Sequence, residues 1–263
     1  MIVLLLAGLG LIFGSFVNAL VWRLHEHRNW VNERSECSNC HHVLAPKDLV
    51  PVVSWLSLKG RCRYCGHIIE DSPLVELTTS LVFVCSYAFW PLPLHGSGLL
   101  QFGAWLLCVV IFMALLVYDV RWFLLPNKLV YPLIAISVIF VLIPALFFDG
   151  SWHQVLSAAV GAVVMSGLFY VLFQMSKGEW IGGGDVKIAI ALGLLSGGPL
   201  QAALLLFFAS MIGVLFSLPQ LIQKKRKAMT IKVPFGPFLI LATIIVELCG
   251  SGIVDWYTRL FTA

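Results

Sequence analysis

Two aspartates, Asp119 and Asp185, each lie where an apolar segment meets a short polar one. Two carboxylates that come close together cannot both ionise, so they share one proton. The ionised carboxylate can then take a proton from water while the protonated one polarises a peptide carbonyl, which is the chemistry of an aspartic protease. Each aspartate also has a simpler interpretation, because Asp119 could mark a helix end and Asp185 could cap a helix.

The residues next to the two aspartates suit such a site. Three glycines precede Asp185, and glycine lets a substrate backbone approach a carboxylate closely. A proline and an asparagine break the chain shortly after Asp119. The supporting residues predicted on this basis are Gly182, Gly183, Gly184, Pro126 and Asn127. Lys187 receives no catalytic role, since residues two apart do not share a helix face.

Four cysteines form a second candidate site. Cys37 and Cys40 make one CxxC pair, and Cys62 and Cys65 make another, with 21 residues between the pairs. Two such pairs converge as four thiolates around tetrahedral zinc, and four thiolates leave no open position for catalysis. We therefore predict a structural zinc ion. Two disulfides are the alternative, which a reducing compartment would disfavour.

The composition excludes a soluble globular, a disordered and a collagen-like chain. Of the 263 residues, 60% are hydrophobic and only 11% are charged, against about 25% in an ordinary soluble domain. The charge-free runs predict an all-α polytopic membrane protein with about eight transmembrane helices. Residues 1–22 carry no charge and form the first helix, residues 23–72 form a small polar zinc-binding domain, and residues 73–263 hold the other helices and both aspartates.

The positive charges indicate the orientation. Sixteen of the 17 Lys and Arg residues fall in four segments, which are residues 23–72, 119–128, 177–187 and 223–232. Because cytoplasmic loops are enriched in Lys and Arg, the N-terminus is predicted outside and the cysteine region in the cytoplasm. Both aspartates then lie at the cytoplasmic face. The basic run at residues 224–227 is interpreted as a loop near anionic lipid, so we expect no nucleic-acid partner. No internal repeat is evident.

Two other classes of function remain open at this point. A non-enzymatic scaffold could use its zinc ribbon to dock a cytoplasmic partner, and its aspartates would be mere helix ends. A transporter could use the aspartates as a proton or ion relay, but this predicts charges deep within the spans. Only Glu76 and Glu247 are candidates for such charges. Replacing either aspartate with asparagine separates the protease from the scaffold.

Several motifs, in order and spacing, resemble the bacterial type IV prepilin peptidases, which are membrane aspartic proteases of the GxGD kind. The resemblance covers most of the chain. It rests on Gly14-Ser15-Phe16-Val17-Asn18, Ser54-Trp55-Leu56, Lys59-Gly60-Arg61-Cys62, Ser72-Pro73-Leu74-Val75-Glu76-Leu77, Leu125-Pro126-Asn127, Gly182-Gly183-Gly184-Asp185-Val186-Lys187 and Pro234-Phe235-Gly236-Pro237-Phe238. Ser38 stands where many members have proline.

The resemblance implies a bacterial inner-membrane enzyme. Its substrates would be membrane-embedded precursors of type IV pilins or type II secretion pseudopilins. Asp119 and Asp185 match the family's catalytic aspartates. Many members also methylate the new N-terminus with S-adenosylmethionine, an activity linked to the cytoplasmic cysteine domain. This chain has that domain, so the resemblance implies both activities, although no S-adenosylmethionine motif is visible.

Overall fold

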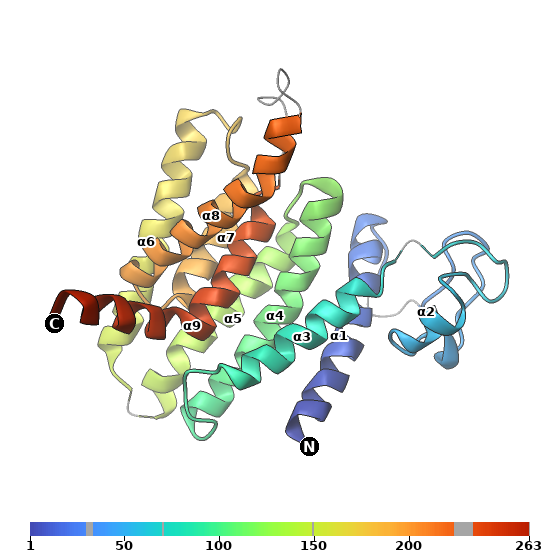
Figure 1. The fold of residues 1–263 in the computed structure, drawn as a ribbon, viewed down its shortest axis with the longest axis horizontal. Coiled ribbons are helices and arrows are strands. Elements are labelled where there is room, and N and C mark those ends of the chain that lie inside the picture. Colours follow the sequence, from blue (N-terminus) through green and yellow to red (C-terminus); the bar gives the residue numbers. More distant parts are fainter. Residues whose placement is uncertain (30–33, 70, 149, 224–233, 263) are drawn as a thin grey trace. The chain divides into compact units, whose positions relative to one another are not determined.

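The computed structural model describes residues 1–29, 34–69, 71–148, 150–223 and 234–262. Nearly all of its regular structure is helical (Figure 1). In chain order the helices are α1 (Ile2–His25), the 3₁₀ turn η1 (Pro46–Asp48), α2 (Val53–Ser57), α3 (Leu74–Ala88), α4 (Ser97–Trp122), α5 (Asn127–Phe147), α6 (Trp152–Met175), α7 (Gly183–Leu195), α8 (Pro199–Gln223) and α9 (Gly236–Thr262). Pairing between extended segments in the described residues is limited to two isolated bridges, both in the cysteine region.

The all-α membrane class is confirmed. Within the described chain, α1 and α3–α9 follow the order of the eight predicted spans, and six of them are long and apolar enough to cross a membrane. The other two are shorter, with 15 residues in α3 and 13 in α7. At a rise of 1.5 Å per residue they reach only about 20 Å, which is less than the bilayer core.

The first helix continues past the predicted end at residue 22 as far as His25. Arg23 is the first charge in the chain, yet it is buried and donates a hydrogen bond to the Ser35 hydroxyl at 3.3 Å. Because the Ser35 hydroxyl accepts this hydrogen bond, the guanidinium has a partner while buried, and the helix can continue beyond Arg23. The basic run at residues 224–227 lies outside the described residues.

Two compact units make up the chain, and each is described by itself. The first comprises Met1–Ala88 with Val109–Val117. In it α1 and α3 touch backbone to backbone at two glycines of α1. A Cβ on Gly10 would lie 2.5 Å from the Cα of Ser80, and one on Gly14 would lie 2.5 Å from the Cα of Glu76. Small residues allow such close packing of membrane helices.

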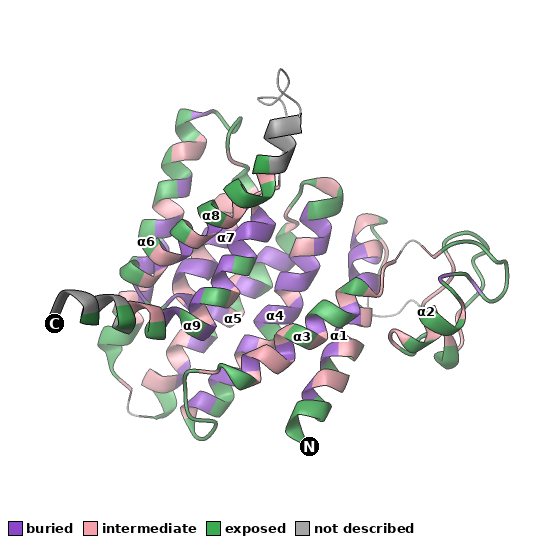
Figure 2. Ribbon diagram, viewed as in Figure 1, coloured by how far each residue is buried: buried purple, intermediate pink, exposed green. Residues whose placement is uncertain are grey.

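The second unit comprises Phe89–Cys108 with Tyr118–Ala263. Its α6 and α7 also pack through small residues, since a Cβ on Gly193 would lie 2.6 Å from the Cα of Ala162. Figure 2 shows buried residues along α7, among them Ile188, Leu192 and Leu195. This short helix is enclosed by its neighbours, so its N-terminus and Asp185 are held in place by packing.

Candidate functional site

Asp119 lies in the last turn of α4, and its side chain is only 6% exposed. The helix ends at Phe123, which adopts a left-handed conformation (φ 55°) and donates its backbone N–H to the Asp119 carbonyl at 2.8 Å. The Asp119 carboxylate accepts a hydrogen bond from the backbone N–H of Gly236, the first residue of α9. A helix N-terminus favours a negative charge beside it. Asp119 is thus a buried carboxylate at the start of a second helix.

Asp185 occupies the same kind of position. It lies in the first turn of α7, and its Oδ2 accepts a hydrogen bond from the backbone N–H of Gly182 at 3.3 Å. The backbone N–H of Asp185 in turn donates to the Gly182 carbonyl at 3.0 Å. Each aspartate therefore receives a backbone N–H at a helix N-terminus, α9 for Asp119 and α7 for Asp185.

Leu125 joins these two helix starts. A Cβ on Gly184 would lie 2.9 Å from the Leu125 Cβ, and one on Gly236 would lie 3.5 Å from the Leu125 Cδ2. Leu125 belongs to the short connection between α4 and α5, so this connection packs against the N-termini of both α7 and α9. The two carboxylates are close enough to interact electrostatically. The sequence-predicted pair is therefore brought together within one unit.

A polar contact also joins the start of α5 to α7. The Lys187 ammonium donates to the Asn127 Oδ1 at 2.9 Å and lies 5.9 Å from the centre of the Tyr131 ring. Asn127 is the first residue of α5, and Pro126 caps that helix in an extended conformation. Pro126 and Asn127 thus start α5 beside α7, and their support of the aspartate pair stays a prediction.

The three glycines before Asp185 differ in their surroundings. Gly182 and Gly183 are exposed, and a Cβ on either would meet no atom closer than 3.4 Å. Gly184 faces Leu125, where a Cβ would not fit. Close approach of a substrate backbone therefore stays a prediction for the first two glycines, while the third is needed for packing.

The four cysteines come together in the first unit. The sulfur atoms of Cys37, Cys40, Cys62 and Cys65 all lie within 4.8 Å of one another. The Cys37 and Cys65 Sγ atoms are 3.8 Å apart. Four sulfurs at about 2.3 Å from a tetrahedral zinc ion are separated by about 3.8 Å, so the cluster fits zinc. The backbone N–H of His67 and the side chain of Asn39 lower the pKa of the Cys65 thiol to about 6, whereas desolvation and the neighbouring thiols raise the pKa of Cys40 to about 11. A metal needs all four thiolates, so zinc binding would release protons from this cluster.

The two cysteine pairs are copies of one another at a shift of 25 residues. In the first, Cys37 donates its N–H to the His42 carbonyl and receives the N–H of His41. In the second, Cys62 does the same with His67 and Gly66. The residues that turn the chain, His41 and Gly66, both have positive φ, 54° and 71°. The bridges Glu36–Val43 and Arg61–Ile68 extend the match. The structure therefore contains an internal repeat that was not evident in the sequence.

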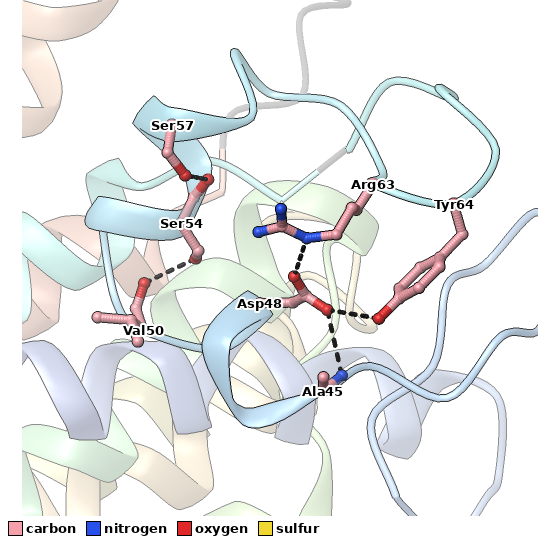
Figure 3. Close-up of polar contacts among 7 residues, drawn as sticks. All are labelled: Ala45, Asp48, Val50, Ser54, Ser57, Arg63 and Tyr64. Carbon is pink, nitrogen blue, oxygen red and sulfur yellow. Dashed lines mark hydrogen bonds and ion pairs between the residues drawn. The ribbon is translucent and has the colours of Figure 1, made fainter.

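Asp48 ties the connection between the two pairs to the second pair (Figure 3). Its side chain is only 2% exposed, and it accepts hydrogen bonds from Arg63 Nε at 2.6 Å, the Tyr64 hydroxyl at 3.0 Å and the Ala45 N–H at 3.2 Å. The Arg63 guanidinium is the main cause that holds the pKa of the Asp48 carboxyl below its usual range. Asp48 is thus a structural anchor of the cysteine region.

Replacing Asp48 with asparagine is expected to lower the thermal midpoint of the cysteine region at neutral pH. A depressed pKa adds stability above the unfolded pKa of about 3.9, and this stability is lost as the pH falls through the folded pKa. The difference between wild type and Asp48→Asn should therefore be constant above about pH 5 and shrink below about pH 4. Thermal melts of both proteins at each pH measure this difference in midpoint. Comparing the two proteins at the same pH cancels the effect of zinc loss in acid, which both share. Glu26→Gln, at an exposed residue, is the control, and a pH-independent difference would contradict the ionic anchor.

Comparison with known proteins identifies the family of this chain. The model of the bacterial peptidase A24 N-terminal domain matches residues 9–90, and that of the type IV leader peptidase family matches residues 104–218. A prepilin leader peptidase/N-methyltransferase of Xanthomonas campestris is 32% identical over 279 residues, covering 96% of this chain and 93% of that protein. The chain belongs to the type IV leader peptidase family. Proteins with the same description from Bacillus subtilis and Pseudomonas aeruginosa are 29% and 30% identical, each over 95% of this chain. No solved structure gives a significant match.

The two candidate sites fall in different family matches. Asp119 and Asp185 lie within the leader peptidase match, and the four cysteines lie within the N-terminal-domain match. Three residues of this family member were not predicted as site residues, namely Leu125, Lys187 and Gly236. The sequence did indicate that Gly236 is special, because prolines stand close to it on both sides, at positions 234 and 237. A glycine between two prolines indicates a fixed turn against a neighbour.

Proposed function

We propose that this member of the type IV leader peptidase family removes the basic leader of prepilins or pseudopilins at the cytoplasmic face of the bacterial inner membrane, and then N-methylates the new N-terminus. The names of its relatives support the reaction class. The observation that carries the proposal is the pairing of Asp119 and Asp185 in one unit, each beside a helix N-terminus.

In the proposed reaction Asp119 and Asp185 share one proton. The ionised carboxylate removes a proton from a water molecule, whose oxygen attacks the scissile carbonyl carbon. The protonated carboxyl donates its proton to the carbonyl oxygen, giving a neutral tetrahedral intermediate. In the collapse, the carboxyl that took the proton from water donates it to the leaving nitrogen, and the C–N bond breaks. The other carboxylate takes a proton from a hydroxyl of the intermediate as the new carbonyl forms, so the pair is again singly protonated. The pair titrates as a unit, so the rate should show a bell-shaped dependence on pH.

The position of the pair suits a substrate held in the bilayer. Both aspartates lie at helix ends, where a scissile bond at the membrane surface could reach them. A precursor with a basic leader and an apolar helix would diffuse in the plane of the membrane and present its cut site at this depth. This requires the predicted orientation, with the N-terminus outside and the cysteine region in the cytoplasm.

The cysteine region is proposed to hold one zinc ion through Cys37, Cys40, Cys62 and Cys65. Zinc would supply a cross-link and no open coordination position, so its part is structural. S-adenosylmethionine is the proposed methyl donor, and residues 23–72 are the domain on which methylation depends. None of this chain's residues is assigned to the methyl donor.

Mass spectrometry of a membrane prepilin tests both activities. The substrate is incubated with the reconstituted protein and S-adenosylmethionine, and the mature product is analysed. We expect loss of the leader together with a mass increase equal to one methylene group. Cleavage without this increase would remove the methyltransferase proposal. An intact, zinc-loaded protein that cleaves no prepilin would favour the scaffold.

Gly236→Ala is expected to reduce cleavage by about a hundredfold while the protein still folds. The added Cβ would lie 2.5 Å from the Asp119 Oδ2, so the carboxylate or the start of α9 must move. A displacement of about 1 Å at a catalytic group costs about a hundredfold in rate. Steady-state cleavage measures the effect, and Gly252→Ala, with no atom within 4 Å of the added Cβ, is the control. Equal activity of the two variants would contradict the contact.

Lys187→Met is expected to lower kcat/KM about tenfold or more, since a hydrogen bond to a charged group is worth about 1.5–3 kcal/mol. The lost bond links Asn127 to the helix that carries Asp185. Lys187→Gln retains an N–H donor and should recover part of the activity. Lys177→Met, at an exposed lysine before α7, should change nothing. If Lys187→Met retains full kcat/KM, the bond does not position Asp185.

A further inference from the structure

An exposed apolar face lies in the cysteine region, between the two cysteine pairs in sequence. It consists of Val50, Val53 and Leu56, which we call the α2 patch. These residues are three apart in sequence, and their exposed fractions are 43%, 62% and 61%. Val53 and Leu56 share one face of α2 by their spacing, and Val50 precedes the helix, before the bend at Val52. Contiguous exposed apolar side chains usually mark a surface that meets a partner or a membrane.

The two serine hydroxyls of this turn are paired internally (Figure 3), whereas the indole nitrogen of Trp55 is buried without a hydrogen-bond partner. The Ser54 hydroxyl donates to the Val50 carbonyl at 2.7 Å, and the Ser57 hydroxyl donates to the Ser54 carbonyl at 2.9 Å. A hydroxyl that is bonded to its own helix backbone needs no external partner. The turn therefore does not depend on water to pair these hydroxyls.

A buried carboxylate fixes the patch to the helices of the first unit. The backbone N–H of Val52 donates to the Glu76 carboxylate in the first turn of α3, and the Glu76 backbone packs against Gly14 of α1. Val52 has φ 60° and ψ −49°, a conformation that is strained for a β-branched residue. The strained bend and its bond to Glu76 set where α2 begins relative to α3.

The place of attachment indicates what covers the patch. Next to Glu76, α3 exposes Leu74, Leu77 and Leu81, with exposed fractions of 64%, 47% and 61%. Although α3 is too short to be one of the six membrane-spanning candidates, it packs against α1, which is one of them, so we expect its exposed leucines to face lipid. The α2 patch is thus pinned to the end of α3 where the lipid-facing surface begins.

The charges beside the patch agree with this location. Lys47 and Lys59 flank it in sequence, and both are exposed. The nearest acidic residue in sequence, Asp48, is already bonded to Arg63 and Tyr64. Lysines beside an apolar face are typical of segments that lie in the interface of an anionic membrane.

We propose that the α2 patch binds the surface of the bilayer in which the chain is embedded. Val50, Val53 and Leu56 lie among the lipid headgroups and upper acyl chains, and Lys47 and Lys59 contact anionic lipid phosphates. The cysteine region is then attached to the membrane at three points, which are α1, α3 and this patch. This attachment does not depend on the reaction that the chain catalyses.

Site-specific photocrosslinking in nanodiscs tests the proposal. Full-length protein carrying p-benzoylphenylalanine at position 53 is reconstituted with phosphatidylglycerol and phosphatidylethanolamine, irradiated and analysed by mass spectrometry. Position 68 is the matched control, because Ile68 is 63% exposed but belongs to the second cysteine pair. Zinc content shows that each variant retains the folded region.

We expect lipid adducts at position 53 in at least fivefold excess over position 68. Lys47→Glu with Lys59→Glu should reduce the adducts at position 53 in anionic nanodiscs and leave them unchanged in phosphatidylcholine. Equal yields at positions 53 and 68 would overturn the proposal. Adducts at position 53 that form with an added prepilin and not with lipid would also overturn it, and would make the patch a protein-docking surface.

Discussion

Asp119→Asn and Asp185→Asn are each expected to abolish cleavage, with rates lower by a factor on the order of 10⁴ or more. Asparagine keeps the shape of the side chain and still accepts the backbone N–H that each aspartate receives. The fold should therefore survive while the shared proton is lost. Because the two groups act as a unit, the double variant should be no slower than either single one.

Cleavage of a reconstituted prepilin measures these rates. Glu179→Gln is the matched control, since Glu179 is an exposed carboxylate in the connection before α7. Methylation of a precleaved substrate should persist in both aspartate variants. Cleavage at more than a few per cent of the wild-type rate would show that the pair is not the proton-transfer machinery.

Removing zinc should have the second large effect, confined to the cysteine region. In the described residues between α1 and α3, Cys62 is the only hydrophobic residue that is buried, so this part has no apolar core of its own. A structural zinc site contributes about 10–16 kcal/mol of apparent binding energy at neutral pH. Chelation, or Cys40→Ser with Cys65→Ser, should therefore unfold the region and abolish methylation.

Hydrogen exchange read by mass spectrometry separates local from global unfolding. After chelation, amides of residues 35–69 should exchange fully, while α1 and α3 remain protected by their contacts at Gly10 and Gly14. Cys85→Ser is the control, because Cys85 lies in α3 outside the cluster. Retained protection of residues 35–69 without metal would mean that hydrogen bonds such as those of Asp48 suffice.

The helices could be predicted because lipid imposes a simple rule. A span must lack unpaired charge, so the charge-free runs predicted an all-α membrane protein and the order of its helices. The rule failed at the end of α1, where Arg23 finds a partner in Ser35. That bond joins residues 12 apart in sequence, and no local pattern reveals it.

The candidate sites were predictable in part for the same reason. The residue type and spacing of the aspartates and cysteines indicate their chemistry directly. Gly236 and Leu125 matter only through packing, because one leaves room for a carboxylate and the other fills the space between two helix starts, and a sequence does not show packing. The repeat in the cysteine region was only partly predictable from the sequence. Its signal was the shared order of Cys, Cys, His and an aliphatic residue, but His41 stands where the second copy has Gly66. Both adopt positive φ, so the backbone is repeated where the residue type is not.

The contact between α1 and α3 makes the cysteine region a removable insert. Asn18 donates to the Ser72 carbonyl at 3.4 Å, and Gly14 lies against the Glu76 backbone, so both ends of the insert meet at one helical hairpin. The hairpin is closed by its own glycines and does not depend on what the intervening residues do. Evolution can therefore lengthen, shorten or exchange this region, and with it the proposed methyltransferase activity, without rebuilding the two helices that hold it.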